Sequence, residues 1–170
     1  GSMPVTSLHW WGSHFGLVEP GTVPPQLPIA WNIGFWTNVP ESADINYSYP
    51  EKLLWNIKVP ANRVDVEMVG KDSYHDFYPE DIAFQYTLYL DPNEFFWQSD
   101  YLKDTKDDIF WLSIIAIYDQ DVGTDPEYPW GWKTRPWSWM DDAVRFYYDG
   151  PLEPGMVLDP LAITPIKDPL

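Results

Sequence analysis

The sequence contains no cysteine, so disulfide bonds cannot hold the fold together. A chain of 170 residues can bury a sizeable core without such staples, and its length fits a single domain. The absence of cysteine does not show whether the protein is secreted or intracellular. It only means that disulfide bonds cannot serve as evidence for secretion. We therefore expect the fold to depend on side-chain packing and hydrogen bonds.

Basic residues are scarce: 10 Lys and Arg stand against 26 Asp and Glu, which gives a net charge of −16. Nucleic-acid binding requires clustered Lys and Arg against phosphates, so we expect no nucleic-acid partner, and an anionic membrane surface is disfavoured for the same reason. No apolar run approaches the roughly 20 residues that span a membrane, so we expect no membrane insertion. Cations, neutral glycans and basic proteins remain as partners.

Long helical patterns are also missing, and 18 prolines interrupt both helices and central strands. Aromatic residues make up 18% of the chain, and a chain with so many hydrophobic side chains is not expected to be disordered. This combination favours short strands joined by stiff, Pro-rich loops. Residues 1–3 (Gly-Ser-Met) are typical of a tag remnant, so we assign residues 4–170 to a single domain.

Alternation of apolar and polar residues predicts the strands. The clearest run is 82–90, where every second residue is apolar, as in a half-buried antiparallel strand. Residues 109–118 are apolar on both faces and fit a central strand, with a buried helix as the alternative. Further strands are predicted over residues 5–11, 29–37, 53–59, 64–70, 143–148 and 161–164. About eight short strands with long Pro-rich connections predict an all-β fold, an antiparallel, jelly-roll-like β-sandwich.

The strand predicted over residues 5–11 carries large side chains on both faces. Leu8 and Trp10 share one face, and His9 and Trp11 share the other. Such a strand is either covered on both sides or offers one tryptophan outward.

A tryptophan-rich loop over residues 128–139 is the main candidate for ligand binding. Prolines stiffen it, and indoles offer flat apolar area on which sugar rings stack, while neighbouring cations bond hydroxyl groups. If the loop is extended, tryptophans two apart share a face. The alternative is a loop folded back over the end of the core. We predict ligand contact for the following residues of the loop: Trp130, Trp132, Lys133, Arg135, Trp137 and Trp139.

An acidic turn precedes this loop. Asp119, Asp121 and Asp125 lie around Gly123, and calcium prefers several carboxylates on a tightly turning loop. The turn lacks the full EF-hand pattern, but it predicts a Ca²⁺ site at these three aspartates. The alternative is an acidic loop that is simply solvated.

Motifs for catalysis are absent. The sequence has no nucleophile elbow, phosphate-binding loop or dinucleotide fingerprint. His9, His14 and His75 do not have metal-ligand spacing, so hydrogen-bonded surface histidines are the favoured interpretation. Asp141 and Asp142 could belong to a glycosidase pair, but the sequence does not select two carboxylates over the many others.

Several short motifs occur together in a fixed order. They are HWWGS at 9–13, FWTNVP at 35–40, FQY at 84–86, WLSI at 111–114, YPWGWKTRP at 128–136 and DDAV at 141–144. The chain thereby resembles an uncharacterised domain of unknown function from secreted or cell-surface proteins of environmental bacteria, including planctomycetes, with HWWGS, WTDVP and YPWGWKTR motifs. The resemblance covers about residues 8–144 and implies an extracellular or cell-surface β-domain, but it transfers no catalytic residue. Residues 160–170 depart from the apolar closing strand of that family.

Three functions fit these observations. The first is a non-catalytic polysaccharide-binding domain of a secreted or surface protein, which uses the Trp-rich loop as its platform. The second is a structural or adhesive extracellular module, one among other domains of a larger protein, whose tryptophans form its core. The third is a polysaccharide-active enzyme, hydrolytic or metal-dependent. β-Sandwiches host all three, so the decisive observation is which tryptophans are exposed.

Overall fold

The computed structural model describes residues 3–72, 80–101, 109–119, 125–133, 143–146 and 151–166. Within these ranges the only helical segments are three short 3₁₀ turns: η1 (Ala61–Arg63), η2 (Gln98–Asp100) and η4 (Pro160–Ala162). The strands are β1 (Ser7–His14), β2 (Ala30–Val39), β3 (Tyr49–Pro60), β4 (Asp65–Asp72), β5 (Asp81–Tyr89), β6 (Phe110–Ile117), β7 (Trp130–Trp132), β8 (Val144–Phe146) and β9 (Ile163–Pro165). The all-β prediction is confirmed, and the helix alternative for residues 109–118 is wrong, because most of that run forms β6.

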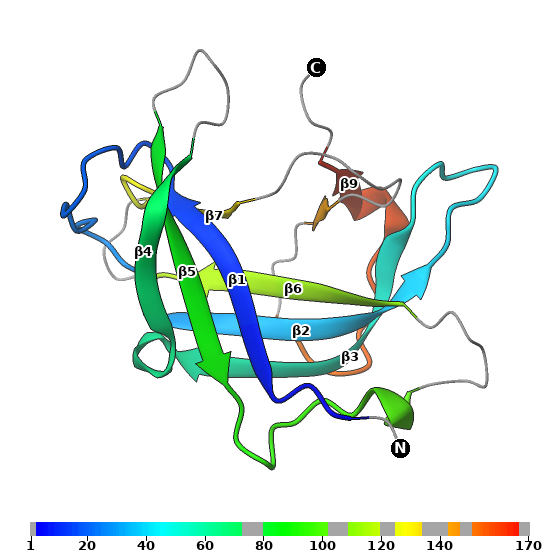
Figure 1. Cartoon of the computed structure of the whole chain (residues 1–170). Helices are drawn as coiled ribbons and strands as arrows, with labels where there is room; N and C mark the ends of the chain where they lie inside the picture. Colours follow the sequence, from blue (N-terminus) through cyan, green and yellow to red (C-terminus); the bar gives the residue numbers. More distant parts are fainter. Residues whose placement is uncertain are drawn as a thin grey trace.

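Two antiparallel sheets form the body of the domain. The larger has the order β4-β5-β1-β7 and the smaller the order β3-β2-β6, while β8 and β9 pair separately. Figure 1 shows the strands of the larger sheet crossing those of the smaller sheet at a steep angle. The β-sandwich predicted from the sequence is confirmed, and its two layers cross.

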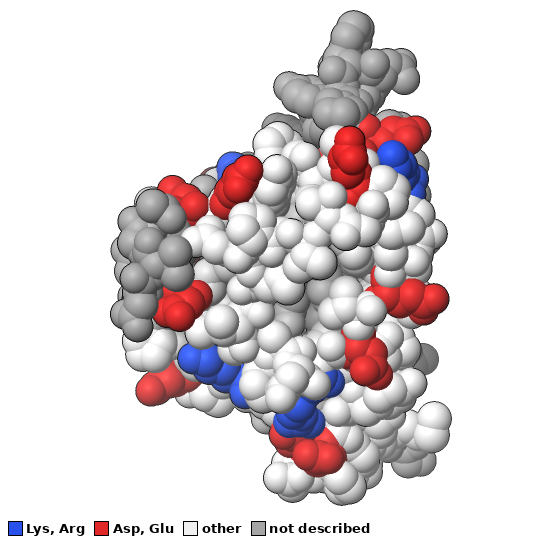
Figure 2. Space-filling model, turned by 90° about the vertical axis from the view of Figure 1, so that its left-hand side faces the viewer, with Lys and Arg blue, Asp and Glu red and all other residues white. Residues whose placement is uncertain are grey.

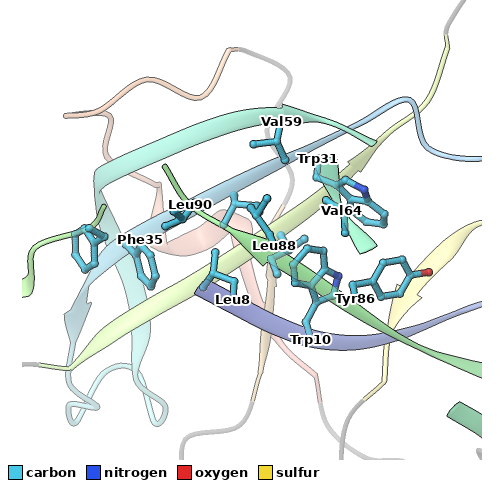
Figure 3. Packing of buried hydrophobic residues seen from close by; sticks show 12 residues of the cluster. Leu8, Trp10, Trp31, Phe35, Val59, Val64, Tyr86, Leu88 and Leu90 are labelled. Atoms are coloured by element: carbon cyan, nitrogen blue, oxygen red, sulfur yellow. The ribbon is translucent and has the colours of Figure 1, made fainter. Parts of the chain in front are cut away.

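The main core lies between the two sheets. On β1 and β5, Leu8 pairs with Leu88 and Trp10 with Tyr86, so their side chains share the inner face. The Trp10 indole stacks on the Tyr86 ring with centroids 5.5 Å apart, and Trp31 of β2 meets both rings edge-on (Figure 3). The period-two pattern over residues 82–90 thus marks the buried face of β5.

A second core covers the other face of the smaller sheet. Trp36 on β2 is fully buried there, and its indole nitrogen donates a 2.8 Å hydrogen bond to the Ser113 hydroxyl of β6. Residues of β3 and of the segment that includes β9 complete the cluster: Tyr49, Leu53, Leu158 and Ile163. Because β2 has a core on each face, its large apolar residues occur at both odd and even positions.

The segment 130–132 corrects the sequence interpretation, which assigned it to a loop. It forms the short edge strand β7, in which Gly12 pairs with Trp132 and His14 with Trp130. A three-residue strand is too short for an alternation pattern to reveal it. Strand pairing therefore fixes where the first two tryptophans of the predicted platform lie.

Candidate functional site

The two neighbouring tryptophans of β1 face opposite sides of the larger sheet. Trp10 points into the core and is 1% exposed, whereas Trp11 points outward and is 47% exposed. Strand alternation explains the difference, because successive side chains leave a strand on opposite faces. Of the two alternatives for this strand, cover on both sides or one tryptophan facing outward, the structure has the second, and the outward residue is Trp11.

The outer face of the larger sheet carries a row of three rings, which we call the aromatic row: Tyr89, His9 and Trp11. The His9 and Tyr89 ring centroids lie 6.4 Å apart in an edge-to-face arrangement, and Tyr89 is 64% exposed. His9 and Trp11 are two residues apart on β1, so their backbone positions are separated by about 7 Å. The row therefore runs obliquely from the end of β5 along β1.

Polar side chains border the aromatic row on β5. His9 pairs with Thr87, and its Nδ1 lies 3.1 Å from the Thr87 hydroxyl, while Trp11 pairs with Gln85. The same outer face thus offers a hydroxyl and an amide beside the rings. This combination of flat apolar area and hydrogen-bonding groups is suited to a polyhydroxylated ligand.

Two exposed carboxylates lie on β4, next to Thr87 and Gln85 of β5. Asp65 pairs with Thr87 and Glu67 with Gln85, so both acids share the outer face with the aromatic row. Neither takes part in an ion pair within the part of the chain that the structure describes. This edge of the face is consequently negative.

Trp130, the first of the predicted platform residues, packs against the core. Its ring centroid lies 4.9 Å from that of Trp31 and 6.0 Å from that of Tyr86. Its backbone nitrogen donates a 2.9 Å hydrogen bond to the hydroxyl of Tyr118. Since this ring faces the interior, we do not include it among the residues proposed below for ligand contact.

Trp132 and Lys133 lie at the β7 edge of the sheet. Trp132 is 43% exposed, and its indole nitrogen donates to the Ile114 carbonyl of β6 at 3.3 Å, which ties the edges of the two sheets together. The Lys133 ammonium lies 3.9 Å from an Asp81 carboxylate oxygen, and its side chain is only 12% exposed. Lys133 is therefore engaged with an acid of the protein itself. The other predicted contacts, Arg135, Trp137 and Trp139, lie outside the described residues.

The predicted calcium site is described only in part. Asp119 and Asp125 are exposed, and Asp121 lies outside the described residues. Among the residues that the structure covers, no three His, Asp or Glu side chains form a group that could hold a metal ion. The Ca²⁺ site stays a prediction.

The two histidines of β1 do not converge. His9 lies on the outer face, whereas His14 is buried on the inner face, where its Nδ1 donates a 3.1 Å hydrogen bond to the Tyr128 carbonyl. Burial lowers the pKa of His14, so the neutral imidazole is favoured in the fold. His75 and the acidic pair Asp141 and Asp142 lie outside the described residues.

A different exposed surface lacks charge. Residues 20–40 contain no Asp, Glu, Lys or Arg, and the loop between β1 and β2 exposes Val23, Leu27 and Ile29. On the side of the molecule where Figure 1 places this loop, Figure 2 shows a broad uncharged area bordered by acidic and basic side chains. An exposed uncharged area of this kind is suited to contact with another protein or domain.

Comparison with protein families places the chain in a known group. The family described as DUF7901, Domain of unknown function, matches residues 1–167. The chain belongs to this family. The DUF7901 match agrees with the sequence interpretation of an uncharacterised domain family, and it assigns no activity. Neither the curated proteins nor the solved structures give a match. Within the described ranges, no helix has the length and hydropathy to cross a membrane.

Proposed function

We propose that this DUF7901 domain is a non-catalytic carbohydrate-binding module of a secreted or cell-surface protein, and that the aromatic row on the larger sheet is its binding face. The observation that carries the proposal is the outward exposure of Trp11 and Tyr89 on one face, 47% and 64% respectively, with His9 between them. Singly exposed aromatics are ordinary on protein surfaces, but an aligned set with hydrogen-bonding neighbours marks a recognition surface.

The dimensions and charge of the face support a glycan. The backbone positions of His9 and Trp11 are about 7 Å apart along β1, and neighbouring strands are about 4.8 Å apart, so several groups of the face lie within the span of a short oligosaccharide. Thr87 and Gln85 lie beside the rings and bond hydroxyl groups well. The net charge of −16 disfavours acidic polysaccharides, so an uncharged or basic glycan is the favoured ligand.

The test is retention on insoluble polysaccharides and mobility in gels that contain soluble ones, measured for the wild type and single variants. Trp11→Ala and Tyr89→Ala should each weaken binding by about 1–3 kcal/mol, because a stacking ring is lost, and should leave the melting temperature nearly unchanged. Leu161→Ala is the control, since Leu161 is 93% exposed on η4. Wild-type protein that binds no glycan in a broad panel would contradict the proposal.

The same experiment separates the face from the Trp-rich loop. Trp132→Ala should weaken binding only if the ligand reaches the β7 edge, where this half-exposed ring lies. Full loss of binding in Trp132→Ala, with no effect of Trp11→Ala, would move the site to the loop that the sequence first indicated.

Adhesion to another protein is the second candidate function. The uncharged area in Figure 2 and the exposed Val23, Leu27 and Ile29 favour it. Charged substitutions at these three positions would disrupt protein contact and leave glycan retention intact, because none of the three residues belongs to the aromatic row.

A further inference from the structure

We propose that the aromatic row and the acids beside it recognise a glycan with free amino groups, such as a deacetylated amino-sugar polymer, in preference to uncharged or acidic glycans. This inference rests on the proposed function and names its ligand class. Its basis is the position of Asp65 and Glu67 on the same outer face as the rings.

Strand pairing places one acid opposite each of the two β1 rings, with one β5 residue between them. Glu67 pairs with Gln85, and Gln85 pairs with Trp11. Two residues further along the strands, Asp65 pairs with Thr87, and Thr87 pairs with His9. Neighbouring strands are about 4.8 Å apart, so the backbone of each acid lies two strand spacings, about 10 Å, from the backbone of the aromatic residue opposite it on β1.

A glycan that crosses the strands would meet these groups in order. A sugar stacked on Trp11 places its edge substituents over Gln85, and the next sugar along the chain reaches Glu67. An ammonium on that second sugar would then face a carboxylate. An uncharged acetamido group at the same place gains no ionic attraction, and a uronic acid carboxylate is repelled.

The two carboxylates are available to a cation. Within the described part of the chain neither forms an ion pair, and both are exposed. Lys71, which is also on β4, pairs with the buried Ile82 and so belongs to the opposite face. The acids of this face therefore have no described basic neighbour on their own strand.

Two described cations that flank the sheet are engaged with acids of the protein. Arg63, which precedes β4, binds Glu94 with a 2.8 Å contact, and Lys133, which follows β7, lies 3.9 Å from Asp81. The described part of the face therefore has a negative potential, in keeping with the net charge of −16, and attracts a polycation.

The test compares two short β-1,4-linked oligosaccharides that share one backbone: glucosamine oligomers and their fully N-acetylated form. Binding is measured by titration calorimetry at low and high salt. An exposed ion pair is worth up to about fivefold in affinity, so two carboxylates should give the glucosamine oligomer an advantage of about fivefold to twentyfold. The advantage should shrink at 1 M salt, where the screening length falls to about 3 Å.

The double variant Asp65→Asn, Glu67→Gln should lose this preference and keep its affinity for the acetylated oligomer. The control is Glu51→Gln with Glu153→Gln, which removes the same charge from two exposed positions on other segments. This control variant should keep most of the preference for the glucosamine oligomer, because the carboxylates of Asp65 and Glu67 remain.

The outcomes separate the two proposals. Equal affinity of the wild type for both oligomers, or equal loss of preference in the two double variants, overturns the amino-sugar inference. In either case binding that still depends on Trp11 leaves the carbohydrate-binding proposal standing. Binding of neither oligomer overturns the inference, and absence of binding across the wider glycan panel is what overturns the proposed function.

Discussion

Gly12 of β1 provides the space that the Trp130 indole occupies. A Cβ atom on Gly12 would overlap the indole nitrogen of Trp130 and lie only 2.7 Å from its Cε2. The ring can therefore cross the inner face of β1 and reach Trp31 and Tyr86 because residue 12 has no side chain.

The first prediction follows from this contact. Gly12→Ala should destabilise the fold by about 1–3 kcal/mol, because the added methyl group forces the indole to move within a packed core. Gly131→Ala is a matched control on the neighbouring strand β7, since a Cβ there has nothing within 4 Å. Urea unfolding of both variants measures the difference, and equal stability of the two would contradict the packing described.

A second prediction compares two tryptophans of the larger sheet. Trp130→Ala should lower the free energy of unfolding by about 3–5 kcal/mol, because it leaves a cavity beside Trp31 and Tyr86. Trp11→Ala should have a much smaller effect, since that ring is 47% exposed. Chemical denaturation of the two variants tests this order; a larger loss for Trp11→Ala would show that its ring is structural.

Sequence patterns predicted the strands better than they predicted which tryptophans are exposed. The alternation over residues 82–90 identified the buried face of β5, because its period reflects local backbone geometry. Trp11 and Trp130 cannot be separated in this way, since each lies beside a glycine and other aromatics. Their environments depend on the pairing of β1 with β7, which joins segments more than a hundred residues apart.

One signal in the sequence could have located the inner face of β1. Gly12 falls in register with Leu8 and Trp10, and a glycine at such a position can mark a place where another part of the molecule approaches the strand closely. The alternation in residues 64–70, in contrast, predicts an apolar face that the structure leaves about half exposed at Val66 and Met68. β4 is an edge strand, so alternation there does not ensure burial.

The third prediction concerns the ion pair that joins η1 to the turn after β5. Arg63 makes two 2.8 Å hydrogen bonds to the Glu94 carboxylate, and they hold the pKa of Glu94 below its ordinary value. A lowered carboxylate pKa adds stability above the unfolded value of about 4.3, and this stability is lost as the pH falls toward the folded value.

Glu94→Gln should therefore reduce stability by about 1 kcal/mol at neutral pH, and the gap to the wild type should narrow in acid. Thermal unfolding at several pH values measures this gap. Glu153→Gln serves as the control for a change of one charge at an exposed position. A gap that widens as the pH falls would rule out the assigned role of Glu94.

The fourth prediction uses His14. Its pKa is lowered by burial, so protonation below the unfolded value of about 6.5 favours the unfolded chain. The wild type should lose stability relative to His14→Gln as the pH drops from about 8 to about 5.5, a range that spans this value. Urea titrations of both proteins at the two pH values provide the measurement, and a constant difference between them would mean that His14 does not titrate differently in the fold.

The central claim is that a glycan binds to the outer face of the larger sheet. The most direct test follows the indole N–H resonances of the eleven tryptophans by two-dimensional NMR while a bound glycan is titrated in. Single Trp→Phe variants assign the peaks. The Trp11 resonance should shift with the ligand, whereas those of Trp10, Trp31 and Trp36 should stay in place because these rings are buried in the cores. Saturable glycan binding that leaves the Trp11 resonance unmoved would contradict the claim.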